Sequence, residues 1–210
     1  MKECCNNRIF YKNAMDYNLL TNFAMGIGLS ACAGFRVFIP MLAGAIAAHF
    51  NIIDLPKDMQ WLSGWPAIAV FGTAAIAEVL AYYVPFIDNI LDTIATPLAV
   101  AAGTVLASSI LPVQDLEPSL RWGIGLLAGG SAAGTIQLGT GLLRLLSSKA
   151  TVGAGNAVVA TTENAAAVSG SVLVFFIPIV IALLLLFLIG WIIYKLVGKI
   201  RGKKKYNPGS

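Results

Sequence analysis

The chain has 210 residues, of which 58% are hydrophobic and 11% are charged, and its formal net charge is +4. This composition and the mean hydropathy of +0.80 exclude an ordinary soluble globular domain. The length suits about five or six helical spans of roughly 20 residues each, with no room for a soluble domain beside them. We therefore predict an all-α fold, a polytopic transmembrane helix bundle that forms one membrane domain.

The charged residues gather at the ends of the chain and in two loops. Residues 1–17 and 196–210 are basic, whereas the loops at 54–58 and 115–117 carry an acidic excess. Lysine and arginine are enriched on the cytoplasmic side of membranes, where they meet anionic lipids. We predict that both termini are cytoplasmic and that residues 18–195 form the transmembrane domain, in a bacterial inner membrane. Membrane lipids are the expected partners, nucleic acid is not, and a homo-oligomer is left open.

Arg36 is the only charged residue in the first hydrophobic stretch, Leu19 to Phe50. The stretch is longer than one span needs and contains Gly34 and Pro40, so we interpret it as a broken helix. An arginine at membrane depth costs about 2.5–3.5 kcal/mol on insertion scales, and chains keep one mostly where it faces protein, water or an anionic ligand. The guanidinium could bind a phosphate or carboxylate, helped by the N-terminus of a half-helix that begins near Pro40.

A purely structural role for Arg36 is the alternative. Glu78 is the lone charged residue between Asp58 and Asp88, and it lies in the middle of the predicted second span. A buried ion pair between Arg36 and Glu78 would lock two helices together without any part in transport. Both interpretations remain open from the sequence.

The segment 86–97 is too polar to cross a bilayer alone. It places Asp88 and Asp92 four residues apart, on one face if the segment is helical. We expect an interfacial helix, or half of a re-entrant hairpin whose second half begins at the proline that ends the segment. Asp92, Glu78 and Glu163 are candidates for charge coupling, as carriers of a proton or cation.

We place Arg144 and Lys149 at the cytoplasmic end of the span before them, so parity requires residues 153–171 to cross the membrane if the C-terminal tail is cytoplasmic too. The rival is one long tilted helix that begins at Glu163. Asn89 and Asn156 occupy matching positions in two segments that are weakly similar to each other. These segments could form an inverted repeat, a common way for transporters to build a midplane site, with the two asparagines where hairpins turn.

The chain offers little material for enzymatic or metal chemistry. His49 is the only histidine, and the sequence has no His-Glu-x-x-His or Gly-x-Ser-x-Gly motif. The three cysteines lack the spacing of a metal site. We therefore expect no enzyme, no cofactor and no metal ion.

Several motifs spread along the chain point to one family. They are Gly28–Pro40 (GLSACAGFRVFIP), Trp61–Pro66 (WLSGWP), Glu78, Pro85–Asp92 (PFIDNILD), Thr96-Pro97 and Gly155-Asn156. With these motifs the chain resembles, over about residues 24–190, the bacterial membrane family catalogued as domain of unknown function 4126. The family name supplies no activity.

A shorter similarity covers the ten residues from Phe35 to Gly44. They are similar to the Arg-x-Phe-x-Pro-x-x-Ala-Gly motif of the DedA (VTT-domain) proteins. This resemblance implies inverted re-entrant hairpins, and an anionic substrate such as the polyprenyl-phosphate or phospholipid head groups that some members translocate. The resemblance implies that Arg36, Phe38 and Pro40, which match the motif, have a role at the site.

The sequence thus favours a small membrane transporter or lipid flippase-like protein that moves an anionic substrate through a midplane site. The substrate-binding candidates are Arg36, Phe38, Pro40, Asn89 and Asn156, and the charge-coupling candidates are Glu78, Asp92 and Glu163. The alternative is a structural or assembly membrane protein in which a buried arginine–glutamate pair only fixes helix packing.

Overall fold

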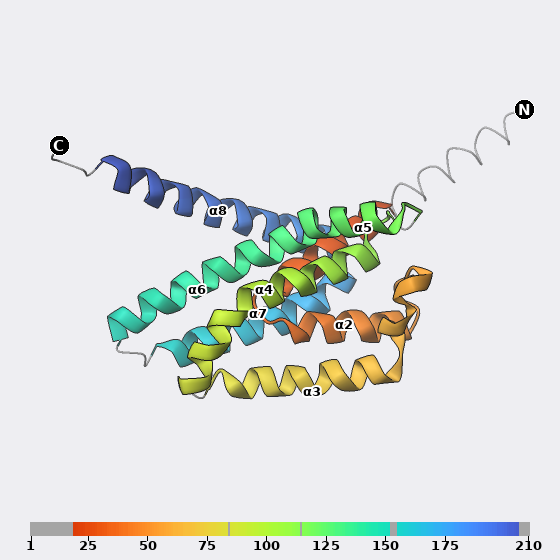
Figure 1. Ribbon diagram of the computed structural model, residues 1–210, viewed down its shortest axis with the longest axis horizontal. Coiled ribbons are helices and arrows are strands. Elements are labelled where there is room, and N and C mark those ends of the chain that lie inside the picture. The colour runs from red at the N-terminus through yellow and green to blue at the C-terminus, as the bar shows by residue number, and fades with distance from the viewer. Residues whose placement is uncertain (1–18, 84, 114, 152–154, 206–210) are drawn as a thin grey trace, which may run out of the picture.

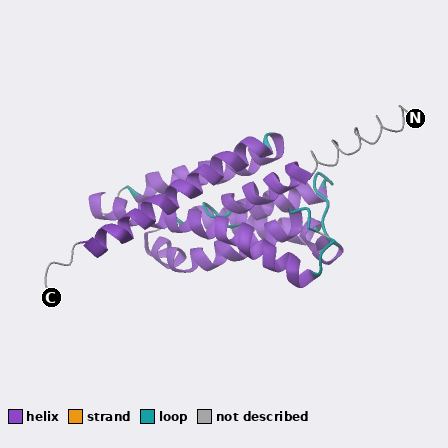
Figure 2. Cartoon of the chain, turned by 90° about the horizontal axis from the view of Figure 1, so that it is seen from above, coloured by secondary structure: helices purple, strands orange, loops and turns teal. Residues whose placement is uncertain are grey.

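The computed structural model describes residues 19–83, 85–113, 115–151 and 155–205, and statements about side chains do not extend to 85–93, 148–151, 179, 181–182 and 196–205. Within these ranges every regular element is a helix and no strand is present (Figure 2). The all-α class is therefore confirmed for the described part of the chain. The predicted cytoplasmic segment 1–17 lies outside it.

The helices follow one another with short connections (Figure 1). The first described helix, Leu19–Cys32, is followed by α2 (Phe38–His49), the 3-10 helix η1 (Lys57–Ser63), α3 (Trp65–Ala81) and α4 (Pro85–Ile110). The second half contains α5 (Pro118–Gly125), the π-helical η2 (Leu126–Gly130), α6 (Ser131–Thr151), α7 (Asn156–Phe176) and α8 (Pro178–Lys205). The elements α5, η2 and α6 form one continuous helix.

The predicted break in the first hydrophobic stretch is present, and it makes a helical hairpin. Figure 1 shows the first helix running inward from one end of the molecule and α2 running back to the same end. Leu29 on the inward arm and Gly44 on the returning arm face each other. Since α2 has 12 residues, it is about 18 Å long, so the tip of the hairpin lies deep inside the bundle. Arg36 is in this tip.

The expectation for residues 86–97 is wrong. These residues belong to α4, which continues from Pro85 to Ile110 with Pro97 inside it, so neither a separate interfacial helix nor a hairpin turn is found here. A proline removes one backbone donor and bends a helix, and neighbouring helices can compensate the freed carbonyl. The polar residues of this segment therefore lie in the first turns of a long helix, α4.

The chain breaks again between α7 and α8. Ile177, which precedes Pro178, has φ −136° and ψ 62°, outside the helical region. A residue before proline is disfavoured in the helical conformation, so α7 ends here. The single long helix from Glu163 onward is therefore wrong, and α7 is a separate helix.

The idea of an inverted repeat does not fit the two segments that suggested it. The matched positions run from Asn89 to Leu106 in α4 and from Asn156 to Leu173 in α7, and Figure 1 shows both helices running in the same direction. They are therefore parallel to each other, whereas an inverted pair would run in opposite directions.

Glycines bring the helices of the bundle into close contact. A Cβ on Gly103 of α4 would lie 2.6 Å from the carbonyl oxygen of Gly129 in η2, and a Cβ on Gly129 would overlap the Gly103 carbonyl in return. Ser30 of the first helix adds a hydrogen bond of 2.9 Å to that Gly103 carbonyl. Three helices thus meet at one point, as expected for small residues at membrane-type helix interfaces.

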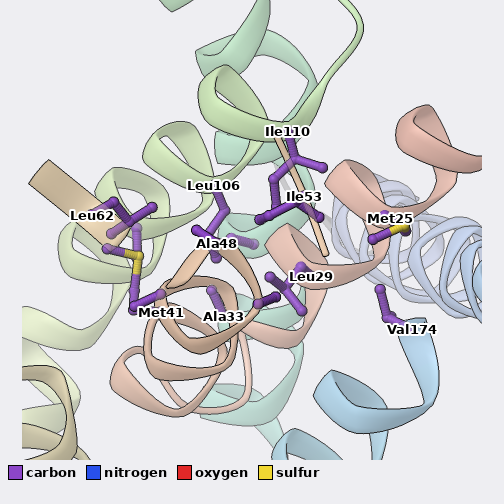
Figure 3. Close-up of a cluster of buried hydrophobic side chains, with 14 of the residues drawn as sticks. Met25, Leu29, Ala33, Met41, Ala48, Ile53, Leu62, Leu106, Ile110 and Val174 are labelled. Carbon is purple, nitrogen blue, oxygen red and sulfur yellow. The ribbon is translucent and has the colours of Figure 1, made fainter. Parts of the chain in front are cut away.

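The main apolar core surrounds the hairpin (Figure 3). Leu29 and Met41 from its two arms pack with Leu106 of α4 and Val174 of α7. This packing holds the hairpin between helices that are distant in sequence. The site described below lies at the hairpin tip.

The structure supports part of the membrane prediction, because one or two helices are long and apolar enough to cross a bilayer. By length and composition, α7 could cross a membrane, and so could η1 together with α3, which are joined by a bend of 57°. Four other apolar helical stretches within the described residues have 10–17 residues each, and two of them, Ile94–Ile110 and Leu183–Lys195, are parts of α4 and α8. One or two helices could therefore span a membrane, and the bundle of five or six spans stays a prediction.

Candidate functional site

Arg36 lies in a tight connection that glycine makes possible. The backbone turns through residues 33–35, where the Gly34 amide donates to the Ala31 carbonyl at 3.0 Å. A Cβ on Gly34 would overlap the Ala133 carbonyl of α6. The tip therefore packs directly on the backbone of α6. The Arg36 side chain is 0% exposed.

Glu78 of α3 caps the N-terminus of α2. One carboxylate oxygen accepts a hydrogen bond of 2.8 Å from the Val37 amide, and the other accepts one of 3.0 Å from the Phe38 amide. The first amides of a helix have no partner within the helix, and a negative charge there is favourable. Pro40, in the same first turn, has no amide hydrogen that needs a partner.

The predicted ion pair between Arg36 and Glu78 is therefore corrected. Both oxygens of Glu78 bind backbone amides, and the carboxylate that pairs with Arg36 belongs to Glu163 of α7, 3.3 Å from Nη2. The half-helix N-terminus that we expected to help bind an anion already holds one from the protein itself. The charge-coupling roles of Glu78 and Glu163 stay predictions.

One face of α7 receives the guanidinium of Arg36. Nε donates to the side-chain oxygen of Asn164 at 2.5 Å, and Nη2 donates to the carbonyl of Ala160 at 3.2 Å. Ala160, Glu163 and Asn164 share this face because they are three and four residues apart. The remaining nitrogen, Nη1, is buried and has no hydrogen-bond partner.

A second arginine binds the same carboxylate. Nε of Arg144 in α6 donates to Glu163 at 3.1 Å, and its Nη2 forms an ion pair with the other Glu163 oxygen. The ring of Tyr82 stacks against both guanidinium groups, with its centroid 3.7 Å from Cζ of Arg36 and 4.2 Å from Cζ of Arg144. We call these residues and Asn164 the Arg36 cluster.

Sequence reasoning identified Arg36 and Glu163 but missed the rest of the cluster. Arg144 was assigned to the cytoplasmic end of its span, yet only 3% of it is exposed. It is the only charged residue between Arg121 and Lys149, so the criterion that selected Arg36 could have selected it too. No pattern in the sequence indicated the aromatic ring between the two arginines.

The other predicted site residues are more distant or outside the described side chains. Phe38 is the first residue of α2 and lines a cavity described below. Asn156 begins α7, seven residues and about 10 Å along the helix before Glu163, so it lies away from the Arg36 contacts. The side chains of Asn89 and Asp92 lie outside the described part, and the same holds for Asp88.

Two cavities approach the Arg36 cluster. The first, of about 370 Å³, contains Glu78 and Tyr82 among apolar neighbours, and we call it the Glu78 cavity. The second, of about 190 Å³, contains Glu163, and we call it the Glu163 cavity. The Glu78 cavity is lined by Val37, Phe38, Ala74, Ala77, Glu78, Ala81, Tyr82, Ile94, Ala95 and Leu98. The Glu163 cavity is lined by Phe35, Thr140, Leu143, Val158, Val159, Thr162, Glu163 and Ala166.

One donor in the cluster is left without a partner. A buried guanidinium nitrogen without a partner is a donor for a carboxylate or phosphate oxygen. Among the described residues, no group of three or more histidine, cysteine, aspartate or glutamate side chains could hold a metal ion.

Comparison with known proteins identifies one family model. Residues 23–197 match the family described as Domain of unknown function (DUF4126). No curated protein and no solved structure matches the chain. The predicted family is thus confirmed over most of the chain, and the local similarity to the DedA proteins stays a prediction.

Proposed function

We propose that this chain, which belongs to the DUF4126 family, is a small membrane transporter or lipid flippase-like protein that moves an anionic substrate past Arg36. The observation that carries the proposal is the free Nη1 of Arg36, buried in the hairpin tip. A buried donor without a partner costs about 1–3 kcal/mol, and more when it is charged. An anion that reached Nη1 would remove this penalty.

The surroundings of Arg36 support a site whose occupant can change. The Glu78 cavity and the Glu163 cavity approach the cluster through different helices, and each has a carboxylate in its wall. A negatively charged substrate would compete with Glu163 for Arg36, since both are acceptors for the same guanidinium. Glu163 would couple charge to transport as the protein's own anion, which leaves Arg36 when the substrate binds and returns when it departs.

The bundle fits a lipid environment. In α3, Val70, Ile76 and Leu80 are 60%, 64% and 63% exposed, which is an unfavourable surface in water and a favourable one in a bilayer. We propose an inner-membrane location with the basic end of α8 in the cytoplasm. The location of the N-terminus, which we predict to be cytoplasmic as well, stays a prediction.

Translocation in proteoliposomes tests the proposal. Wild type and Arg36→Gln are reconstituted, and the movement of fluorescent phosphatidylglycerol and the uptake of inorganic phosphate are measured. Loss of charge-assisted hydrogen bonds worth about 1.5–3 kcal/mol lowers a rate by about 10- to 100-fold. Rates equal to wild type in a folded Arg36→Gln protein would exclude a substrate role for Arg36.

Arg121 offers a matched control. It is also a buried arginine, 3% exposed, and its Nε, like Nη1 of Arg36, is buried without a hydrogen-bond partner. It pairs with the carboxylate of Asp58, outside the Arg36 cluster, and it lines neither the Glu78 cavity nor the Glu163 cavity. We expect Arg121→Gln to lower stability while leaving the translocation rate per folded molecule near that of wild type. A fall as large as that of Arg36→Gln would mean that both substitutions act through folding.

A structural or assembly role is the second candidate, with Glu163 in place of Glu78 as the partner of Arg36. The observation in its favour is that Nε and Nη2 of Arg36 and the Glu163 carboxylate are all engaged within the bundle. Such a role predicts no translocation by wild type of either probe and a loss of stability in Arg36→Gln. Translocation by wild type that depends on Arg36 would reject it.

A further inference from the structure

A groove lies between α6 and α8, outside the Arg36 cluster. Its volume is about 210 Å³, and leucine and isoleucine side chains such as Leu142, Leu146 and Ile192 make up most of its wall. Figure 1 shows α6 and α8 separating toward their C-terminal ends. We call it the α6–α8 groove.

The outer end of the α6–α8 groove carries a positive charge. Lys195 lines the groove, and its Nζ lies 4.7 Å from the ring centroid of Trp191, which also lines it. Tryptophan favours the boundary between lipid and water, and Lys195, which ends the apolar part of α8, can extend to the same boundary. Lys195 also begins the basic run that continues with Lys199 and Arg201. A negatively charged head group fits this end by charge.

The α6–α8 groove and the Glu163 cavity share part of their walls. Phe35, Thr140 and Leu143 line both, and Phe35 is the residue before Arg36. The shared residues place the groove beside the cavity that contains Glu163, the carboxylate paired with Arg36. The wall is apolar along most of its length, with the hydroxyl of Thr140 at the junction.

We propose that the α6–α8 groove admits an anionic phospholipid from the bilayer, with its head group at Lys195 and an acyl chain along α6 and α8. This inference rests on the proposed function and names its substrate class. A soluble anion would find no polar partners along the leucine and isoleucine walls, whereas an acyl chain gains from burying them. Movement of the head group past Thr140 then brings a phosphate toward Nη1 of Arg36.

Quenching of Trp191 fluorescence by brominated lipids tests the groove in the full chain. The protein is reconstituted in phosphatidylcholine vesicles that contain brominated phosphatidylglycerol or brominated phosphatidylcholine. The share of Trp191 is the difference between wild type and Trp191→Phe. One lysine near anionic lipid changes binding by about fivefold, so brominated phosphatidylglycerol should quench Trp191 at about fivefold lower mole fraction. Lys195→Gln should remove this preference, and Lys57→Gln, an exposed lysine in η1, should keep it.

Two results would overturn the inference. One is equal quenching of Trp191 by the two brominated lipids in wild type. The other is competition by soluble glycerol phosphate, because the ligand would then be a free anion. A preference for phosphatidylglycerol without Arg36-dependent translocation would refute the proposed function alone. Arg36-dependent translocation without a preference at Trp191 would refute the groove alone.

A glycine pair in α6 gives a second, independent variant. A Cβ on Gly139 would lie 2.8 Å from Cδ1 of Ile192, inside the groove, whereas a Cβ on Gly141 has no neighbour within 4 Å. Gly139→Leu should reduce both the quenching preference and the translocation of phosphatidylglycerol severalfold, and Gly141→Leu should change neither. Equal behaviour of the two variants would contradict the assignment of the groove.

Discussion

Replacing Glu163 by glutamine should destabilise the protein more than replacing Arg36. Glu163 is the carboxylate to which both Arg36 and Arg144 are bound, so Glu163→Gln removes a negative charge from two buried guanidinium groups. Removing one partner of a buried ion pair costs about 3–5 kcal/mol. Arg36→Gln removes one guanidinium and leaves Glu163 bound to Arg144, so it loses hydrogen bonds worth about 1.5–3 kcal/mol.

Thermal unfolding in detergent, followed by intrinsic fluorescence, measures this order. We expect the Tm to fall from wild type to Arg36→Gln and further to Glu163→Gln. The double variant should lose about 1–3 kcal/mol less than the sum of the single variants, because the residues are in contact. A Tm for Arg36→Gln at or below that of Glu163→Gln would refute the idea that one carboxylate serves both arginines.

Three further predictions concern packing around the cluster. Tyr82→Phe should keep most of the stability, since its ring still stacks on the two guanidinium groups. Tyr82→Leu should lose about 2 kcal/mol of cation–π interaction, and equal Tm values for the two variants would contradict the stacking. Gly129→Ala should lower the free energy of unfolding by about 1–3 kcal/mol, because the new Cβ would overlap the Gly103 carbonyl. Gly123→Ala lies in the same continuous helix and has open space at Cβ, so it should leave the free energy of unfolding unchanged or raise it by about 0.5–1 kcal/mol. Glu78→Gln should lower stability by about 1–2 kcal/mol, because it weakens the cap on α2. If the Phe38 amide exchanged its hydrogen at the wild-type rate in this variant, that result would count against the cap.

The hairpin and its arginine could be predicted from the sequence for a physical reason. A single charge in a long apolar stretch is expensive, and glycine with proline interrupts a helix, so these features mark a buried site and a break. The first helix ends at Cys32 and α2 begins at Phe38, on either side of Arg36. Glu163 stood out because acidic residues are rare in membrane helices.

The partners could not be predicted because they depend on packing between distant helices. Glu78 looked like a counter-ion, yet it serves the free amides of another helix, a need that only the three-dimensional position of α2 creates. Arg144 looked like the end of a span because Lys149 follows it closely in the sequence. In the structure, the next helix, α7, places Glu163 within ion-pair distance of Arg144. Pro97 suggested a turn, although a helix of 26 residues accommodates it with neighbours on its sides.

Solid-state NMR in phosphatidylglycerol bilayers would measure most directly whether an anionic group reaches Arg36. Arginine is labelled with nitrogen-15, the Arg36 signal is assigned by its absence from Arg36→Gln, and its dephasing by lipid phosphorus is recorded. The buried side chain of Arg121 provides the internal control. We predict dephasing of the Arg36 signal and none of the Arg121 signal. An Arg36 signal that is present and not dephased would contradict the binding of a lipid phosphate at Nη1.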